Sequence, residues 1–270
     1  MKLGLSSYTY TWAVGVPGAL PEKPMRGPDL LARAVELGAR MVQIADNLPL
    51  EHFSESELDE LETCARERGI QIEVGTRGIA PTHLGRMLAL AERFHSPILR
   101  VVTDTTGHRP EPAGIVELLR PQREAFLRAG VTLAIENHDR FPASVLAGIV
   151  RALGTEWVGV CLDTVNSFGA LEGPRVVVET LGPLTVNLHV KDFAIFRAGH
   201  QMGFTIEGRP AGQGRLDVPW LLELLHQQGR DVNAILELWT PPEAALDNTI
   251  AKERRWAEES AAYLRTLIKE

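Results

Sequence analysis

Four ionisable residues end apolar stretches in the second half of the sequence. They are Glu136 in AIENH, Asp163 in VCLDT, His189 in NLHVKD and Glu237 in ILELW. The gaps between them are 27, 26 and 48 residues, which fits one residue from each of four successive strand–helix units, with an insertion before the last. Other ionisable residues at the ends of apolar runs are Asp46, Glu73, Asp104, His138 and Lys191.

Three carboxylates and one imidazole in one pocket require a cation. Without it the carboxylates would repel one another, and their burial would cost free energy. Oxygen-rich ligation with a single nitrogen suits Mn²⁺, Mg²⁺ or Co²⁺, and the set contains no thiolate of the kind that structural zinc sites use. The alternative is that these are separate polar residues facing solvent. Because all four fit one repeating pattern, the sequence favours one divalent metal ion per chain.

Eight short apolar runs, each followed by a helical stretch, would position these residues. Several runs are continuously apolar, as expected of parallel strands covered on both faces. Eight units of roughly 34 residues predict an α/β fold, a (β/α)8 TIM barrel, as a single domain over residues 1–270. Glycines that favour a left-handed helix C-cap stand between helix and strand at Gly69, Gly130, Gly154, Gly182 and Gly229. The predicted strands are Leu3–Tyr10, Met41–Asp46, Ile70–Val74, Ile98–Asp104, Val131–His138, Val158–Thr164, Thr185–Phe193 and Ala234–Thr240.

Two connections are longer than a barrel requires. Residues 12–28 follow the first predicted strand, and residues 194–219 follow the seventh. Both would lie at the C-terminal face of the barrel, where enzymes of this fold keep their chemistry. We expect a wall or a lid over the site there, with a tolerated surface insertion as the alternative for the first.

The composition excludes several other classes of protein. Hydrophobic residues make up 44%, charged residues 23%, and the mean hydropathy is −0.05, which is ordinary for a globular protein. The net charge is −7 with no basic block, so nucleic acid is not an expected partner. No run is long enough for a membrane span or a signal peptide. The two cysteines, Cys64 and Cys161, fit a reducing compartment, and we expect a cytoplasmic protein.

The segments IENH, CLDTVNSFGALEG, NLHVKDF, GQGRLDVPWLLELL and ILELW together resemble the xylose isomerase-like TIM-barrel superfamily, in its branch of sugar isomerases and epimerases. The resemblance extends over the whole chain in strand order. It implies a small-molecule carbohydrate substrate and one catalytic metal, usually manganese, held by Glu136, Asp163, His189 and Glu237. Relatives often form dimers or tetramers, so a homo-oligomer is an option that the sequence leaves open.

Two branches of that superfamily fit less well. Endonuclease IV needs many histidines for three zinc ions, whereas Asn166 stands three positions after Asp163 and the later strands hold no HxH or HxxH pair. Ketose 3-epimerases resemble this chain in the stretch ENHDRF, but they continue with a second glutamate where this chain has Pro142. They also carry a histidine at the position of Asn166. Simple ketose epimerisation is therefore less well supported.

Strand geometry selects the catalytic candidates. Glu136 and Glu237 lie on opposite sides of the predicted site, so one could remove a proton from carbon while the other returns it. His138 and Lys191 each lie two residues after a candidate metal ligand on the same strand. They should therefore point into the pocket, where either could polarise a substrate oxygen.

The candidates for substrate binding come from the loops. Tyr8 and Trp12, after the first strand, could form the apolar wall under a sugar. The resemblance implies substrate contact at the position of Asn166 and at an arginine after the seventh strand, for which Arg197 is the candidate.

Three functions follow as hypotheses. The main one is a divalent-metal-dependent isomerase or epimerase of a small sugar or keto sugar, acting through a metal-stabilised enediolate. The alternative is a metal-dependent lyase, a decarboxylase or dehydratase, of a keto sugar acid through the same enolate, which Lys191 and His138 favour. The third is a non-catalytic sugar-binding barrel, against which the full set of metal ligands argues.

Overall fold

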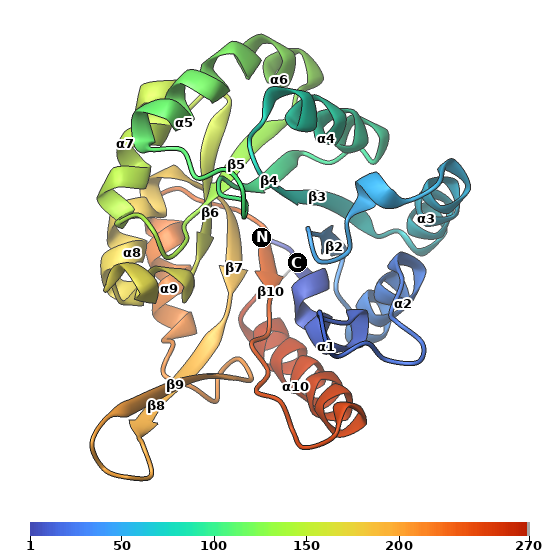
Figure 1. The fold of residues 1–270 in the computed structure, drawn as a ribbon, viewed down its shortest axis with the longest axis vertical. Helices are drawn as coiled ribbons and strands as arrows, with labels where there is room; N and C mark the ends of the chain where they lie inside the picture. The colour runs from blue at the N-terminus through green and yellow to red at the C-terminus, as the bar shows by residue number, and fades with distance from the viewer. Residues whose placement is uncertain (269–270) are drawn as a thin grey trace.

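Eight parallel strands close into a barrel in the computed structural model, which describes residues 1–268 (Figure 1). Around the barrel the order is β1-β10-β7-β6-β5-β4-β3-β2. The predicted single-domain (β/α)8 barrel is confirmed. Its strands are β1 (Leu3–Ser6), β2 (Met41–Ile44), β3 (Gln71–Arg77), β4 (Ile98–Val102), β5 (Thr132–Glu136), β6 (Val158–Asp163), β7 (Thr185–Val190) and β10 (Ala234–Leu236).

Helices surround the barrel (Figure 1). The α-helices are α1 (Thr11–Val14), α2 (Gly27–Leu37), α3 (Glu55–Arg68), α4 (Pro81–Arg93), α5 (Pro112–Leu119), α6 (Arg123–Ala129), α7 (Ala143–Leu153), α8 (Pro174–Leu181), α9 (Val218–Gln227) and α10 (Leu246–Leu267). Short 3-10 turns are η1 (Ser7–Tyr10), η2 (Leu50–His52), η3 (Arg120–Gln122), η4 (Asn166–Ala170) and η5 (Gly182–Leu184). Among residues 1–268, no helix combines the length and the apolar character that a membrane span needs.

The two faces of the barrel strands carry different side chains. Every residue of β1, β2, β4 and β6 is buried, as the continuous apolar runs predict. Outward-facing residues such as Leu133 and Ile135 belong to the apolar core beneath the helices. The inward face is polar over much of its height, because it carries the buried side chains of Gln43, Glu73, Arg100, Asn187 and His189.

The first strand is shorter than predicted. It ends at Ser6, whose hydroxyl accepts a hydrogen bond from the backbone N–H of Tyr8 at 3.0 Å. The Thr9 hydroxyl in turn accepts from the backbone N–H of Ser6 at 3.1 Å. This reciprocal capping starts the 3-10 turn η1, so Tyr8 lies on that turn and not at a strand end.

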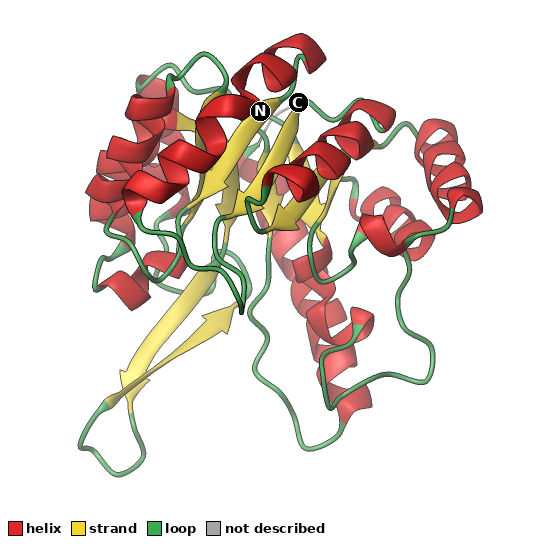
Figure 2. Cartoon of the chain, turned by 45° about the horizontal axis from the view of Figure 1, so that its top comes forward, coloured by secondary structure: helices red, strands yellow, loops and turns green. Residues whose placement is uncertain are grey.

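The seventh predicted strand is two elements. β7 ends at Val190, and β8 (Asp192–Arg197) pairs with β9 (Phe204–Arg209) in an antiparallel hairpin. The hairpin lies in the long connection after the seventh strand and projects from the body of the molecule (Figures 1 and 2). The sequence did not predict these strands. They leave Phe204 65% exposed and Met202 87% exposed.

Glycine has two different roles at the predicted helix caps. Gly69 and Gly130 adopt the left-handed conformation, as predicted, and Gly229 has a positive φ. Gly154 also has a positive φ, but its ψ of 125° lies outside the left-handed helical region. The prediction for Gly182 is wrong, because its φ is −48°. A Cβ atom at Gly182 would lie 2.0 Å from Oε1 of Gln228, so a larger residue there would require the Gln228 side chain to move.

Candidate metal centre and active site

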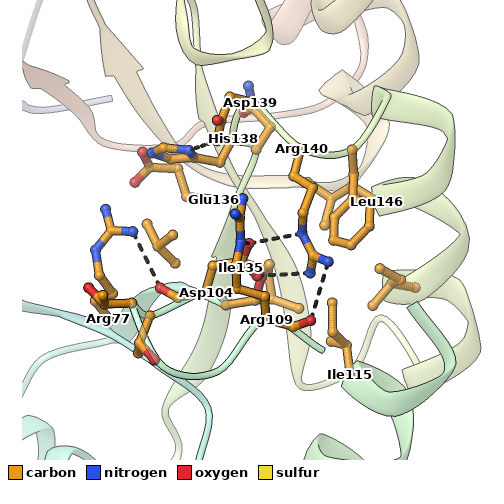
Figure 3. A pocket seen from close by; sticks show the side chains of 17 residues that line it. Arg77, Asp104, Arg109, Ile115, Ile135, Glu136, His138, Asp139, Arg140 and Leu146 are labelled. Carbon is orange, nitrogen blue, oxygen red and sulfur yellow. Dashed lines mark hydrogen bonds and ion pairs between the residues drawn. The ribbon is translucent and has the colours of Figure 1, made fainter. Parts of the chain in front are cut away.

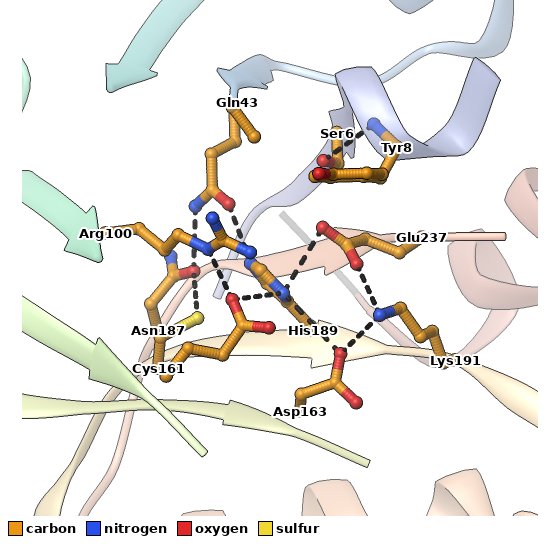
Figure 4. A network of polar contacts seen from close by, with 12 residues as sticks. Ser6, Tyr8, Gln43, Arg100, Cys161, Asp163, Asn187, His189, Lys191 and Glu237 are labelled. Carbon is orange, nitrogen blue, oxygen red and sulfur yellow. Dashed lines mark hydrogen bonds and ion pairs between the residues drawn. The ribbon is translucent and has the colours of Figure 1, made fainter. Parts of the chain in front are cut away.

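The four predicted metal ligands lie at the C-terminal end of the barrel, and Figure 4 shows three of them there, Asp163, His189 and Glu237. Glu136, Asp163 and His189 come from β5, β6 and β7, and Glu237 directly follows β10. All four are buried. Nδ1 of His189 lies 3.3 Å from Glu237 Oε1, 3.5 Å from Glu136 Oε2 and 3.8 Å from Asp163 Oδ2. We call these four residues the metal side of the site.

Three buried atoms of the metal side make no well-aligned hydrogen bond: Asp163 Oδ2, Glu237 Oε1 and His189 Nδ1. Of these, Asp163 Oδ2 forms an ion pair with Lys191. Hydrogen bonds from neighbouring residues fix the Asp163 side chain with its Oδ2 facing the other ligands. Its Oδ1 accepts the backbone N–H groups of Val165 and Asn166 at 2.8 Å each, while the Asn137 side chain holds its backbone on both sides. Buried polar atoms that make no good hydrogen bond are costly, and these three converge within reach of one another. A divalent ion fits this donor set.

Lys191 connects two of the ligands. Its Nζ lies 2.8 Å from Asp163 Oδ2 and 2.8 Å from Glu237 Oε2. Burial opposes a charge on this lysine, but the two carboxylates outweigh that effect and raise its pKa above the ordinary range. In the same way, Lys191 and His189 overcome burial and lower the pKa of Asp163. Lys191 is therefore a fixed positive charge within the site.

A second buried cation, Arg100 on β4, faces the site from the opposite wall. Its Nε donates to Glu136 Oε2, and its Nη1 donates to Asp46 Oδ1 at 2.9 Å. Burial opposes the charge of Asp46, yet Arg100 and Arg77 together lower its pKa. Sequence analysis missed Arg100, although a charged residue inside the apolar run ILRVV was the available sign.

Asn166 and His138 lie at the edge of the metal side. Asn166 Nδ2 donates to Glu136 Oε1 at 2.7 Å, and its Oδ1 accepts from Lys191 Nζ at 3.4 Å. His138 is partly exposed, and its Nδ1 lies 2.5 Å from Asp139 Oδ1. The structure thus brings both residues to the site.

A cavity of about 550 Å³ opens beside Lys191 and Asn166. Tyr8 and Trp12 line it, together with other apolar and aromatic residues: Val165, Phe168, Leu238 and Trp239. Trp12 is held by its Nε1, which donates to the backbone oxygen of Thr240 at 2.8 Å. Tyr8 donates its hydroxyl to Asp46 Oδ2 at 3.1 Å. This wall has the apolar character expected of a surface beneath a sugar.

A second cavity of about 390 Å³ lies on the other side of His138 and Glu136 (Figure 3). Among the charged residues that line this cavity are Arg77, Asp104, Arg109 and Arg140. Together with Asp46, which pairs with Arg77, and Arg100, which pairs with Asp46, we call these four the arginine side. Arg77 Nε donates to Asp46 Oδ2 at 3.0 Å, and Arg140 Nη2 donates to Asp104 Oδ1 at 2.9 Å. The sequence did not mark Arg77 or Arg109, because neither interrupts an apolar run.

Arg197 lies apart from these residues. It is exposed on the hairpin and its guanidinium stacks 4.4 Å from the ring centre of Phe204. Arg197 is not one of the described residues that line the two cavities. The lysine and arginine side chains that line the cavities are instead Lys191, Arg77, Arg109 and Arg140.

The sequence profile of the xylose isomerase-like TIM barrel family matches residues 31–267. The chain therefore belongs to this family, as its motifs indicated. A relative from Pectobacterium atrosepticum, named 3-oxo-isoapionate decarboxylase, is 34% identical over 266 residues, which cover 98% of this chain and 96% of the relative. The family and its named relatives are enzymes that act on sugars.

Solved structures share the fold at low sequence identity. A D-psicose 3-epimerase from Clostridium cellulolyticum, solved with D-tagatose, superimposes with a TM-score of 0.74 at 16% identity and covers all of both chains. A xylose isomerase-like barrel from Mycobacterium smegmatis, solved with magnesium, gives a TM-score of 0.67 at 15% identity over 97% of each chain. These likenesses support the architecture.

Proposed function

We propose that the protein is a divalent-metal-dependent lyase that decarboxylates a keto sugar acid. The observation that carries this proposal is the 34% identity, over 98% of the chain, to a 3-oxo-isoapionate decarboxylase. The reaction is the one that sequence analysis gave as the alternative to isomerisation. Manganese is the ion we expect, with magnesium and cobalt as alternatives, because the donor set is rich in oxygen.

The charge of the site favours an anionic substrate. Glu136, Asp163 and Glu237 bring three negative charges to the centre, and the buried cations Arg100 and Lys191 bring two positive ones. A divalent ion would turn the remaining negative charge into a net positive charge. Such a site attracts a carboxylate, whereas a neutral ketose gains nothing from it.

The chain's own residues fit a decarboxylation. When bound, the metal ion would draw electron density from the keto oxygen of the substrate and stabilise the charge that develops there. The bond between carbon and carboxylate breaks, carbon dioxide leaves, and the electron pair remains on the substrate next to the Lys191 ammonium. His138, whose Nδ1–H donates to Asp139, acts as an imidazolium: it donates its Nε2 proton to that carbon and is left neutral. Because His138 is partly exposed, water can restore the proton.

Isomerisation or epimerisation of a keto sugar is the second candidate. The observation in its favour is the pair of glutamates, Glu136 and Glu237, from two sides of the site. A base that removes a proton from carbon needs a free carboxylate oxygen. Both oxygens of Glu136 are engaged, one by Arg100 and the other by Asn166, whereas Glu237 Oε1 accepts no hydrogen bond, so Glu237 would be the base in this second candidate.

The test compares two substrates with the same enzyme. With Mn²⁺ present, we expect carbon dioxide release from 3-oxo-isoapionate and no interconversion of D-psicose and D-fructose. EDTA and the Glu136→Gln variant should both abolish the release. Epimerisation without carbon dioxide would establish the second candidate, and full activity in EDTA would remove the metal from the proposal.

A further inference from the structure

A buried polar layer lies directly behind the metal side, inside the barrel. It consists of Gln43 on β2, Glu73 on β3, Asn187 on β7 and Asn233 just before β10. Gln43, Glu73 and Asn187 have no exposed surface. No catalytic or substrate-binding role explains these residues, because the layer lies below the cavities, and apolar side chains usually fill this part of a barrel.

Glu73 accepts the hydrogen bonds of this layer, and the neighbouring amides donate them. Its Oε1 accepts from Asn233 Nδ2 at 2.9 Å, and its Oε2 accepts from Gln43 Nε2 at 3.1 Å and from Asn187 Nδ2 at 3.0 Å. A carboxylate can only accept hydrogen bonds, so every neighbouring amide turns its NH2 group towards it. The second N–H of Gln43 goes to Asn187 Oδ1 at 3.0 Å.

Because the NH2 group of Gln43 points to Glu73 and Asn187, its amide oxygen points to His189. Gln43 Oε1 is 2.7 Å from His189 Nε2 (Figure 4). An amide oxygen accepts, so Nε2 must carry the proton, and in the neutral ring Nδ1 then carries a lone pair. Nδ1 is the nitrogen that faces Glu136, Asp163 and Glu237 without a hydrogen-bond partner.

We propose that Glu73 is a positioning residue that acts through Gln43 to fix the metal-binding tautomer and the ring orientation of His189. Metal-binding histidines commonly donate their other N–H to an oxygen that orients them. Here the donated bond passes through an amide before it reaches a carboxylate. This arrangement gives His189 a fixed direction without adding a fourth carboxylate to the three that already crowd the site. The inference rests on the metal site proposed above.

The test measures metal binding instead of activity. Dissociation constants for Mn²⁺ are determined from the electron paramagnetic resonance signal of free Mn²⁺. Glu73→Gln introduces an NH2 group that competes for acceptors in the layer, and Gln43→Met removes the acceptor at His189. Each should weaken Mn²⁺ binding about 10- to 100-fold. Gln43→Glu keeps an acceptor facing Nε2 and should bind more tightly than Gln43→Met.

The control is Thr76→Val, which removes another buried hydrogen bond from β3, that of the Thr76 hydroxyl to His83 at 2.7 Å. It should leave Mn²⁺ affinity within about twofold of wild type, whereas loss comparable to Glu73→Gln would show a general packing effect and overturn the proposal. Unfolding in EDTA reports whether each variant folds. If Glu73→Gln does not fold, the Mn²⁺ affinities of Gln43→Met and Gln43→Glu test the proposal. Tight binding by both Glu73→Gln and Gln43→Met would refute the positioning role, whereas a wild type that binds no Mn²⁺ would refute the metal site itself.

Discussion

On the metal side of the barrel mouth, three carboxylates share two cations of the chain, Lys191 and Arg100, whereas on the arginine side two carboxylates lie among four guanidinium groups. Asp46 contacts Arg77 and Arg100, and Asp104 contacts Arg109 and Arg140. Both sides concentrate ionisable groups, so the presence of charge alone does not distinguish them. The difference is that the donor set of the metal side fits a divalent ion, while on the arginine side guanidinium groups outnumber the carboxylates.

Removing a ligand from the metal side should have the largest effect. Asp163→Asn replaces a charged oxygen of the donor set by a neutral amide, so we expect Mn²⁺ affinity to fall by more than about 100-fold, beyond the usual effect of a residue that only supports a ligand. Decarboxylation should fall with it. Metal content by mass spectrometry and carbon dioxide release measure the two effects. Asp104→Asn on the arginine side is the matched control and should retain the metal.

The arginine side should show its importance in stability. Arg100→Met leaves the buried Glu136 without its cation and Asp46 with Arg77 alone, and breaking a buried ion pair costs about 3–5 kcal/mol. Urea unfolding in EDTA measures this loss. Added Mn²⁺ should recover part of it, because the ion supplies positive charge next to Glu136. Arg109→Met, whose side chain is 60% exposed, should cost far less, and equal costs would contradict the distinction between buried and exposed pairs.

The same difference explains how much of the site the sequence predicts. Glu136, Asp163, His189 and Glu237 end apolar runs at regular spacing, so the repeat that defines the barrel also places them together. Pairing across the barrel leaves no such pattern: Gln43 and Glu73 meet His189 only because β2 and β3 lie opposite β7 in the closed sheet. The sequence did not predict the hairpin for another reason. Its two strands lie in a long loop and pair with each other across a glycine-containing turn.

Arg77 tests whether the arginine side recognises the substrate. It lines the cavity next to His138, and we expect it to bind the carboxylate of the keto acid. Arg77→Ala should raise KM for the keto acid roughly 10- to 100-fold, since a hydrogen bond to a charged group contributes about 1.5–3 kcal/mol. Mn²⁺ affinity should stay at the wild-type value. A fall in kcat with unchanged KM would show that Arg77 acts on the reaction and not on binding.

Glu253 on α10 is a buried carboxylate that, within residues 1–268, pairs with no arginine or lysine, so it extends the comparison. Its oxygens accept the backbone N–H groups of Trp12 and Ala13, at 2.9 and 3.0 Å. Burial raises its pKa to about 7, whereas arginines lower that of Asp46. The folded protein therefore binds more protons than the unfolded chain between about pH 4.5 and 7, and stability should fall as pH rises through that window.

The loss of stability across this window is on the order of 3 kcal/mol, because each tenfold difference in proton affinity between the folded and unfolded states corresponds to about 1.4 kcal/mol. Glu253→Gln should remove the slope. Unfolding free energies at pH 5 and pH 8 for both proteins isolate the contribution of this one group, because every other titrating residue is shared. Parallel pH profiles for the two proteins would rule out the raised pKa.

Substitution of Arg197 should have the smallest effect on KM. It tests whether the cavity arginines or the hairpin bind the substrate carboxylate. The stacking of Arg197 on Phe204 at 4.4 Å is exposed, and such contacts contribute about 0.5–1 kcal/mol. Arg197→Ala should therefore change KM for the keto acid by less than about threefold. A rise as large as that of Arg77→Ala would instead assign carboxylate binding to the hairpin. The hairpin would then have to close over the cavity when substrate binds, which protection of β8 and β9 from hydrogen exchange would reveal.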